Sequence, residues 1–185
     1  MEKKLEQKPS DIVKIVLFGP ECSGKTTLAK ELAKKYQTLW VPEFARDYLQ
    51  KKWDKQGLIC EEQDIIPIAQ GQIYSENHLT PKAHKILFCD TNILETKVYA
   101  EQYFKNYKNT TLEKAVKDLQ YNLYFLTDVD IPYEKDDLRD RPNQRQKMFS
   151  AFETALKKYH CPYYTLSGSK TERLQKATKI IDNLL

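Results

Sequence analysis

The sequence has few of the residues that build metal centres and flexible linkers. Its four cysteines are scattered without a C-x-x-C pair, and its three histidines form no H-x-G-H motif. This pattern argues against a zinc site and indicates reduced thiols. No apolar run approaches the roughly 20 residues needed to cross a bilayer, and the charged first ten residues do not resemble a signal peptide. We therefore expect a soluble, cytoplasmic protein that does not contact membranes.

The sequence also has no long block of charged residues of one sign. The formal net charge of +4 arises from 30 basic and 26 acidic residues that are interleaved. This balance suits an anionic small molecule better than a nucleic acid, so no nucleic-acid partner is expected. The 185 residues contain no repeat and no Gly/Ser linker, which predicts one domain over 1–185 with a flexible segment at 1–10.

Short apolar runs alternate with segments of helical periodicity. Strands are predicted at 12–18, 38–42, 86–89, 123–127 and 162–166, and helices at 25–36, 43–53, 61–79, 94–104, 112–119, 141–159 and 171–184. This alternation predicts an α/β fold, with a five-stranded parallel sheet in the order 2-3-1-4-5 flanked by helices. The charged segment 128–142 fits neither element and predicts a mobile surface loop.

Two of the five glycines stand five residues apart, directly after the first predicted strand. The run Gly19-Pro20-Glu21-Cys22-Ser23-Gly24-Lys25-Thr26 matches G-x-x-x-x-G-K-[ST], the P-loop of the P-loop NTPase fold. The glycines let the backbone turn its amides around a phosphate, and the following helix adds the positive end of its dipole. The run and the adjacent Thr27 therefore predict an ATP site, with Lys25 on the terminal phosphates and the Thr26 hydroxyl on Mg²⁺.

An acidic residue at the end of a neighbouring strand is the second expected metal contact. Asp90 ends the strand 86–89 and is the candidate. The alternative is a helix cap, because Asp90, Thr91 and Asn92 are all residue types that cap helices.

The class of P-loop protein follows from other motifs. The N-K-x-D motif of GTPases does not occur, and "LSGSK" at 166–170 lies too far beyond Asp90 for the signature of an ABC ATPase. The arginine-rich segment 128–145 instead predicts the lid of a small-molecule kinase. Arg139, Arg141 and Arg145 would neutralise charge on the transferred phosphoryl group. The alternative is a solvated charged loop.

The stretch "VPEFARD" predicts the acceptor side of the site. Glu43, Arg46 and Asp47 share one helical face at the carboxyl edge of the sheet, where ligands bind in open α/β folds. A carboxylate there is able to accept a proton from an attacking hydroxyl. A Glu–Arg pair within the helix is the alternative.

Several strings together resemble the ribosylnicotinamide kinase domain of the NadR family. They run from about Val16 to Phe152: "FGPECSGKTTLAKELA", "WVPEFARDYL", "IAQGQ", "ILFCDTN", "TKVYAEQYF", "LYFLTDVDIPYEKDDLRDRP" and "RQKMF". The resemblance implies transfer of the ATP γ-phosphate to the ribose 5′-hydroxyl of nicotinamide riboside, which gives nicotinamide mononucleotide.

The resemblance also implies roles for individual residues. Glu43 would be the general base, and Arg139 and Arg141 would belong to the lid. Aromatic residues would sandwich the pyridinium ring, with Asp130 adding charge and ribose contacts. The candidates for the sandwich are Trp40, Phe44, Tyr74 and Tyr133.

This sequence departs from the family pattern at two positions. Asn92 stands where an acidic residue is expected, and Tyr133 stands where tryptophan is expected, which puts a second acidic contact and the ring selectivity in doubt. Without an upstream nucleotidyltransferase motif or a helix-turn-helix segment, the chain is expected to phosphorylate but not to adenylate or repress. The rival interpretations are a kinase for another nucleoside or small alcohol, a regulatory nucleotide-binding ATPase, and a nucleic-acid-binding ATPase.

Overall fold

The computed structural model describes residues 5–136, 138 and 142–185. Its centre is a five-stranded sheet in the order β2-β3-β1-β4-β5, in which every neighbouring pair is parallel. The predicted fold class and strand order are therefore confirmed. The strands are β1 Val13–Phe18, β2 Trp40–Val41, β3 Ile86–Asp90, β4 Leu123–Thr127 and β5 Tyr163–Leu166.

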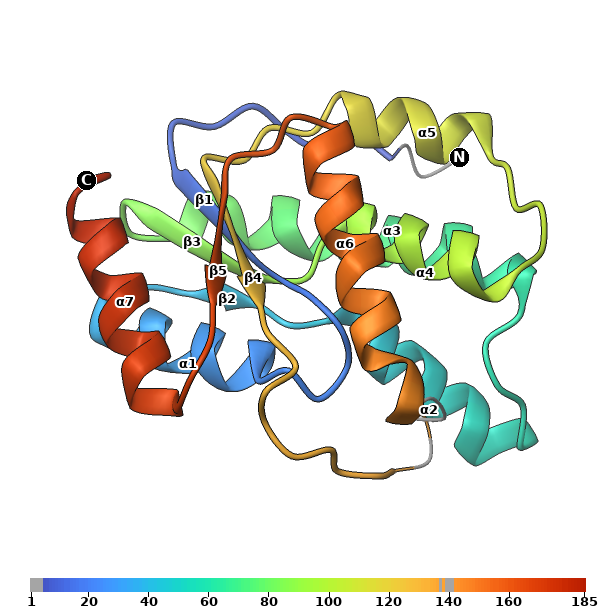
Figure 1. The fold of residues 1–185 in the computed structure, drawn as a ribbon. Helices are drawn as coiled ribbons and strands as arrows, with labels where there is room; N and C mark the ends of the chain where they lie inside the picture. Colours follow the sequence, from blue (N-terminus) through green and yellow to red (C-terminus); the bar gives the residue numbers. More distant parts are fainter. Residues whose placement is uncertain (1–4, 137, 139–141) are drawn as a thin grey trace.

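Helices cover both faces of this sheet, as Figure 1 shows. The helices are α1 Lys25–Lys35, α2 Phe44–Gln56, α3 Ile65–Leu79, α4 Ile93–Tyr103, α5 Thr110–Lys117, α6 Arg145–Lys158 and α7 Lys170–Asp182. Alternate residues of β1 point to opposite faces: Ile15 and Leu17 pack with α1 and α7, whereas Val16 and Phe18 pack with α3 to α6. Burial on both faces explains why the strand is an unbroken apolar run.

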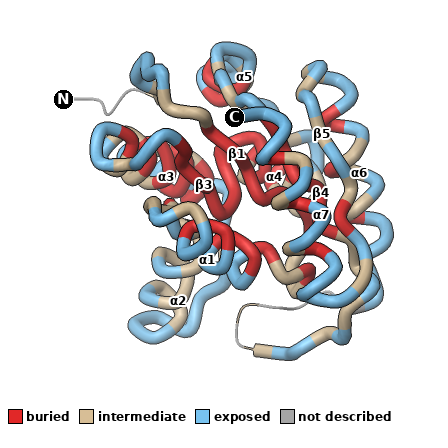
Figure 2. The backbone as a smooth tube through the Cα atoms, turned by 90° about the vertical axis from the view of Figure 1, so that its left-hand side faces the viewer, coloured by how far each residue is buried: buried red, intermediate tan, exposed pale blue. Residues whose placement is uncertain are grey.

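Burial is highest in the central strands and lowest in α2 (Figure 2). All six residues of β1 are at least half-buried, and all five of β3 are fully buried. None of the residues of α2, all of which the structure describes, is fully buried. The register places Leu17 of β1 beside Asp90 of β3, so the end of the acidic strand lies next to the turn that follows β1.

Several predicted boundaries shift for local reasons. The second strand shrinks to Trp40–Val41, because Pro42 has no amide to extend the ladder. The helix predicted at 61–79 begins as a 3₁₀ turn at Glu62–Asp64, closed by a capping box between Glu61 and Asp64. The helix predicted at 141–159 starts at Arg145, after a 3₁₀ turn at Pro142–Gln144.

The N-terminal segment, expected to be flexible, is held against the body where it is described. The Gln7 side chain donates to Glu76 Oε1 at 2.6 Å, and the Lys8 amide donates to Asn77 Oδ1 at 2.8 Å. Residues 128–136 form neither helix nor strand, and the predicted lid arginines Arg139 and Arg141 lie outside the described residues. Across the described chain, no helix combines the length and the apolar character that a membrane span requires.

Candidate active site

The turn between β1 and α1 is tightly constrained by β4. Gly19 and Gly24 have φ angles of 138° and 84°, which L residues rarely adopt. A Cβ on Gly19 would lie 2.8 Å from Thr127 Oγ1 and 2.9 Å from the Thr127 carbonyl oxygen. Glycine is therefore required at this position by the close approach of β4 as well as by the backbone angle.

Two side chains of the turn hold its interior together. The Ser23 hydroxyl is 2.6 Å from both the Pro20 carbonyl oxygen and Thr127 Oγ1. The Lys25 ammonium is buried and donates to the carbonyl oxygens of Gly19 and Pro20 at 2.7 and 2.9 Å. Lys25 therefore lies inside the turn, where the motif predicts a lysine that contacts phosphates.

Three acidic residues surround Lys25. Burial disfavours its ammonium, but the charges of Glu95, Glu43 and Asp90 outweigh this effect and raise the pKa of Lys25. Glu95 Oε1 lies 3.3 Å from Lys25 Nζ, and Glu95 Oε2 accepts from the Gly19 amide at 3.3 Å. Burial, the largest cause, raises the pKa of Glu95 to about 8, although Lys25 opposes the shift. The sequence analysis missed Glu95, whose position in the first turn of α4 resembles an ordinary capping carboxylate.

Asp90, the predicted metal contact, lies at the end of β3 beside Thr26 of α1. Its Oδ2 accepts from the Thr26 hydroxyl at 2.5 Å, while its Oδ1 is buried and has no hydrogen-bond partner among the described residues. Burial first, and the charge of Glu43 second, raise the pKa of Asp90 to about 6. A cation bound between Asp90 and Thr26 would satisfy the orphaned oxygen and offset the burial of the carboxylate. These two oxygen ligands fit Mg²⁺, which keeps waters and phosphate oxygens in its shell.

The residue that caps the helix after β3 is Asn92 and not Asp90. The Asn92 side chain accepts from the amides of Leu94 and Glu95 and caps α4. Its amide group donates to the Tyr124 hydroxyl at 2.9 Å, so the residue is fully committed to structure. Across the described ranges, no three His, Cys, Asp or Glu side chains form a group that would hold an ion by themselves.

The remaining predicted residues of the turn lie at its outer side. Cys22 has a left-handed φ of 52°, and its thiol contacts the Glu134 backbone, with Sγ 3.2 Å from the carbonyl oxygen. Glu21 is half-buried beside it, and Thr27 is exposed in the first turn of α1. The loop after β4 is therefore packed directly on the phosphate-binding turn.

On the predicted acceptor side, Glu43 is the N-cap residue of α2. Its backbone is extended, and its carboxylate makes no capping hydrogen bond within the described residues. Its charge is among the causes of the raised pKa values of Lys25, Asp90 and Glu95. Glu43 thus lies near the phosphate-binding turn with its carboxylate available for other contacts.

The other polar residues of α2 have separate partners. Arg46 pairs with Asp136 of the loop after β4 at 2.5 Å, so its main contact is with the lid segment rather than within the helix. Asp47 is exposed in the first turn of α2. Of the three residues predicted on one helical face, Glu43 is the N-cap residue that precedes α2, and Arg46 is directed toward the loop after β4.

The structure separates the four aromatic candidates. The Phe44 ring lies against Gly71 of α3, where an added Cβ would be 2.1 Å from Phe44 Cε1, and the Phe44 amide donates to Gln72 Oε1 at 2.8 Å. Trp40 packs on the α1 side of the sheet under the ammonium of Lys30. Tyr74 is 63% exposed and stacks on His78, and Tyr133 is half-buried in the loop after β4. Of the four, Phe44 is the first residue of α2 and directly follows Glu43 in the chain.

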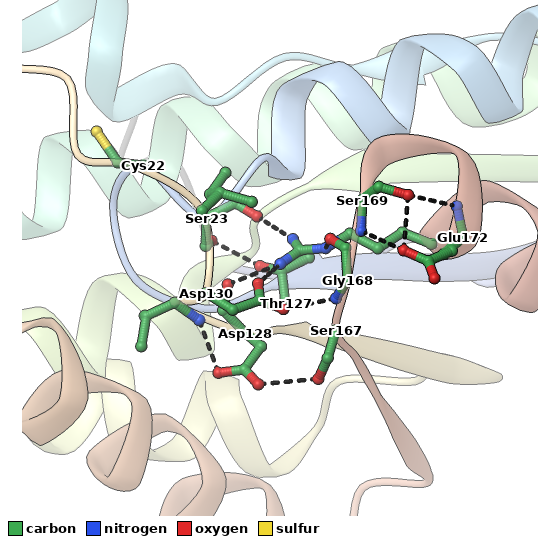
Figure 3. Close-up of polar contacts among 12 residues, drawn as sticks. Cys22, Ser23, Thr127, Asp128, Asp130, Ser167, Gly168, Ser169 and Glu172 are labelled. Atoms are coloured by element: carbon green, nitrogen blue, oxygen red, sulfur yellow. Dashed lines mark hydrogen bonds and ion pairs between the residues drawn. The ribbon is translucent and has the colours of Figure 1, made fainter.

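Two predicted ligand contacts instead have protein partners. The Arg145 guanidinium, expected on the nucleotide, donates to the carbonyl oxygens of Cys22 and Ile131 at 2.7 and 2.9 Å. Asp130, expected on the ribose, pairs with Arg173 of α7 and accepts from the Gly168 amide at 2.5 Å (Figure 3). Sequence reasoning missed Arg173, because one basic residue among 30 in the chain carries no signal by itself.

Comparisons with known proteins agree with this geometry. The chain is 25% identical over 134 residues to the trifunctional NAD biosynthesis/regulator protein NadR of Escherichia coli, an alignment that covers 72% of the chain. The NadR protein of Salmonella typhimurium is similar to the same degree. The chain spans about a third of the length of these curated relatives, with 32% of each covered.

Solved structures share the fold. A NadR protein in complex with NR superposes with a TM-score of 0.75 at 18% identity, covering 94% of this chain and 50% of that one. A NadR protein in complex with NAD and AMP-PNP superposes with a TM-score of 0.73 at 20% identity, with coverage of 94% and 49%. Deoxyadenosine kinase from M. mycoides gives 0.69 at 12% identity, with coverage of 92% and 100%. The chain has the fold of P-loop kinases.

A family model described as AAA domain matches residues 14–173. The match begins in β1, ends in α7 and includes every residue of the phosphate-binding turn together with Asp90 and Glu95. On this evidence the chain belongs to the AAA domain family.

Proposed function

We propose that this protein is an ATP-dependent kinase that phosphorylates the ribose 5′-hydroxyl of nicotinamide riboside to give nicotinamide mononucleotide. The observation that carries the proposal is the position of Glu43. Its carboxylate is unused in capping and lies near Lys25 and Asp90 on the phosphate-binding side. The similarity to NadR supports the choice of nicotinamide riboside.

The nucleotide half of the reaction follows from the turn. Its amides and the N-terminus of α1 bind the phosphates of ATP, and Lys25 moves from the loop carbonyls to the terminal phosphates. Thr26 and Asp90 would hold Mg²⁺, which supplies charge neutralisation at the phosphates when bound. The terminal phosphate would then lie between Lys25 and α2, where an acceptor beside Glu43 can reach it.

The acceptor half uses α2. The 5′-hydroxyl oxygen forms a bond to the γ-phosphorus as the bond to the bridging oxygen of ADP breaks. Glu43 accepts the hydroxyl proton during this attack. Phe44 supplies an aromatic face beside the cationic ring of the nucleoside, a type of contact worth about 1 kcal/mol. The ion pair between Arg46 and Asp136 holds the loop after β4, the proposed lid, against α2, and the closed lid excludes water.

The decisive experiment is a direct assay of both reaction products with the purified protein. ATP, Mg²⁺ and nicotinamide riboside are mixed with the protein, and ADP and the mononucleotide are quantified by chromatography. We expect acceptor-dependent ADP release with an equal amount of mononucleotide. A panel of other nucleosides and small alcohols runs beside it.

Each rival interpretation has its own outcome. Faster turnover of another nucleoside than of nicotinamide riboside would assign the site to that acceptor and refute the proposed substrate. Slow ATP hydrolysis that no acceptor stimulates would identify a regulatory ATPase. Salt-dependent binding of oligonucleotides would identify a nucleic-acid-binding ATPase.

A further inference from the structure

Behind the phosphate-binding turn lies a buried arginine that the catalytic scheme does not use. Arg173 of α7 is 3% exposed, and its guanidinium donates to the Ser23 carbonyl oxygen at 2.5 Å and to the Gly168 carbonyl oxygen at 2.9 Å. It also donates to the Asp128 carbonyl oxygen at 3.1 Å and pairs with the Asp130 carboxylate. Figure 3 shows Ser23 of the turn, Asp128 and Asp130 of the loop after β4 and Gly168 before α7 gathered in one place.

A second arginine contacts the neighbouring peptide group. Arg145, at the start of α6, donates to the Cys22 carbonyl oxygen at 2.7 Å, so two successive carbonyls of the turn, 22 and 23, each accept from an arginine. Charge-assisted hydrogen bonds of this kind are about twice as strong as neutral ones. The two arginines therefore fix the orientation of two consecutive peptide groups.

The orientation of a carbonyl determines the orientation of the amide that shares its peptide group. In a trans peptide the C=O and N–H bonds point in opposite directions, so the amides of Ser23 and Gly24 point away from the arginines. The left-handed φ angles of Cys22, 52°, and Gly24, 84°, alternate with Ser23 between them. Such alternation creates a concave nest of N–H groups that binds anions.

The same arginines hold the base of the loop after β4. Arg145 donates to the Ile131 carbonyl oxygen, and Arg173 contacts Asp128 and Asp130. Ile131 Cδ1 would be 3.4 Å from a Cβ placed on Gly24, so the loop is also in close contact with the turn. Because each arginine contacts both segments, a substitution of either one removes hydrogen bonds to the turn and to the loop after β4 at the same time.

From these contacts we propose that Arg173, assisted by Arg145, is a positioning residue for the nucleotide: it orients the amides of Ser23 and Gly24 toward the phosphates and couples the turn to the lid loop. Arg173 touches neither substrate. Its contribution is the alignment of backbone donors before ATP arrives, which lowers the cost of ordering the turn on binding.

The test is direct measurement of nucleotide affinity by calorimetry on the whole chain, with a non-hydrolysable ATP analogue and Mg²⁺. We expect Arg173→Met to weaken binding by about tenfold or more, the cost of losing charge-assisted hydrogen bonds. Arg173→Lys should recover part of the loss, because an ammonium still donates hydrogen bonds to carbonyl oxygens. Asp130→Asn, which leaves the contacts of Arg173 with carbonyl oxygens in place, should weaken binding less than Arg173→Met.

The matched control is Lys176→Met on the same helix, whose ammonium donates to the exposed Thr165 carbonyl oxygen, and its nucleotide affinity should equal that of the wild type. The proposal is overturned if folded Arg173→Met binds the analogue as tightly as the wild type, even if its melting temperature is lower. If Arg173→Met does not fold, Arg145→Gln decides: weaker nucleotide binding supports the proposal, and unchanged binding overturns it.

The inference rests on the nucleotide half of the proposed function and not on the acceptor. Analogue binding by the wild type is measured without nicotinamide riboside, so a wrong acceptor assignment leaves the test intact. In steady-state assays with the best acceptor found, Arg173→Lys should raise the KM for ATP and leave the acceptor KM within about twofold.

Discussion

The two halves of the site are built differently. On the proposed nucleotide side, the side chains of Ser23, Lys25 and Arg173 are buried, at most 7% exposed. Lys25 and Arg173 donate buried hydrogen bonds to carbonyl oxygens of the turn. On the acceptor side, α2 has no fully buried residue, although the structure describes the whole helix. Its contacts include the Phe44 ring on Gly71, the ion pair of Arg46 with Asp136, and the contacts of Tyr48 and Lys52 with Asp64.

This difference separates what must be invariant from what can adapt. Any triphosphate presents the same phosphate groups, so a rigid turn with preset amides suits all such ligands. Acceptors differ in shape, and a helix without a fully buried residue can shift at a smaller cost to the stability of the fold than a buried turn. We therefore expect changes in the turn to abolish activity, and changes in the packing of α2 to alter selectivity.

The largest effect is expected from Lys25→Ala. Loss of the ammonium that serves the terminal phosphates should lower turnover by about a thousandfold. Glu95 also loses its buried partner, so a lower melting temperature should accompany the loss. Activity per folded molecule is the quantity to measure, with Lys34→Ala in the exposed last turn of α1 as the control. Full turnover in the Lys25 variant would refute the assigned role of the turn.

Glu43→Gln should act on chemistry and leave nucleotide binding unchanged. Without a carboxylate to accept the hydroxyl proton, kcat should fall by about a hundredfold, while the Kd for the ATP analogue stays near the wild-type value. Asp54→Asn, an exposed carboxylate near the end of the same helix, is the control. If kcat does not change, another group accepts the proton.

A smaller and more selective effect is expected from Gly71→Ala. The new methyl group would lie 2.1 Å from Phe44 Cε1, so the ring must move. The acceptor KM should rise roughly fivefold, about 1 kcal/mol of misplaced packing, with the KM for ATP unchanged. Equal changes in both KM values would show that the two sides are not independent.

The last prediction concerns stability against pH rather than turnover. The pKa of Glu95 is raised to about 8 from an ordinary value of 4.5, so folding favours its protonated form. Its contribution to the free energy of unfolding is fully present below about pH 4.5 and declines as the pH rises to about 8. Glu95→Gln cannot ionise, so its stability relative to the wild type should increase across this window. Parallel urea titrations at several pH values test this, and a constant difference would contradict the assigned shift.

The fold and the phosphate-binding turn are well predicted from sequence because their signals are local. Apolar runs and helical periods give the strands and helices, and the strand order follows from the P-loop context. Gly19, Gly24, Lys25 and Thr26 lie within eight consecutive residues, so their proximity is guaranteed by chain connectivity.

The residues that the sequence analysis missed are distant in the chain. Arg173 contacts Ser23 across 150 positions, and Glu95 contacts Gly19 across 76. Asp130 stays a predicted ribose contact, and packing of α7 also gives it an arginine partner. Such pairs depend on which helices the sheet brings together, and no local pattern encodes them.

By itself, the sequence determined the sheet, the turn that contains the glycines and the presence of Asp90 at the end of a buried strand. Only the tertiary structure decided which side chains meet around the turn: Glu95 against Lys25, Arg145 and Arg173 behind the turn, and Asn92 as the cap of α4. The physical reason is that backbone conformation follows from neighbouring residues. The partners of a buried charge are chosen by packing among segments far apart in the chain, where each buried ion needs an opposite charge or a hydrogen bond.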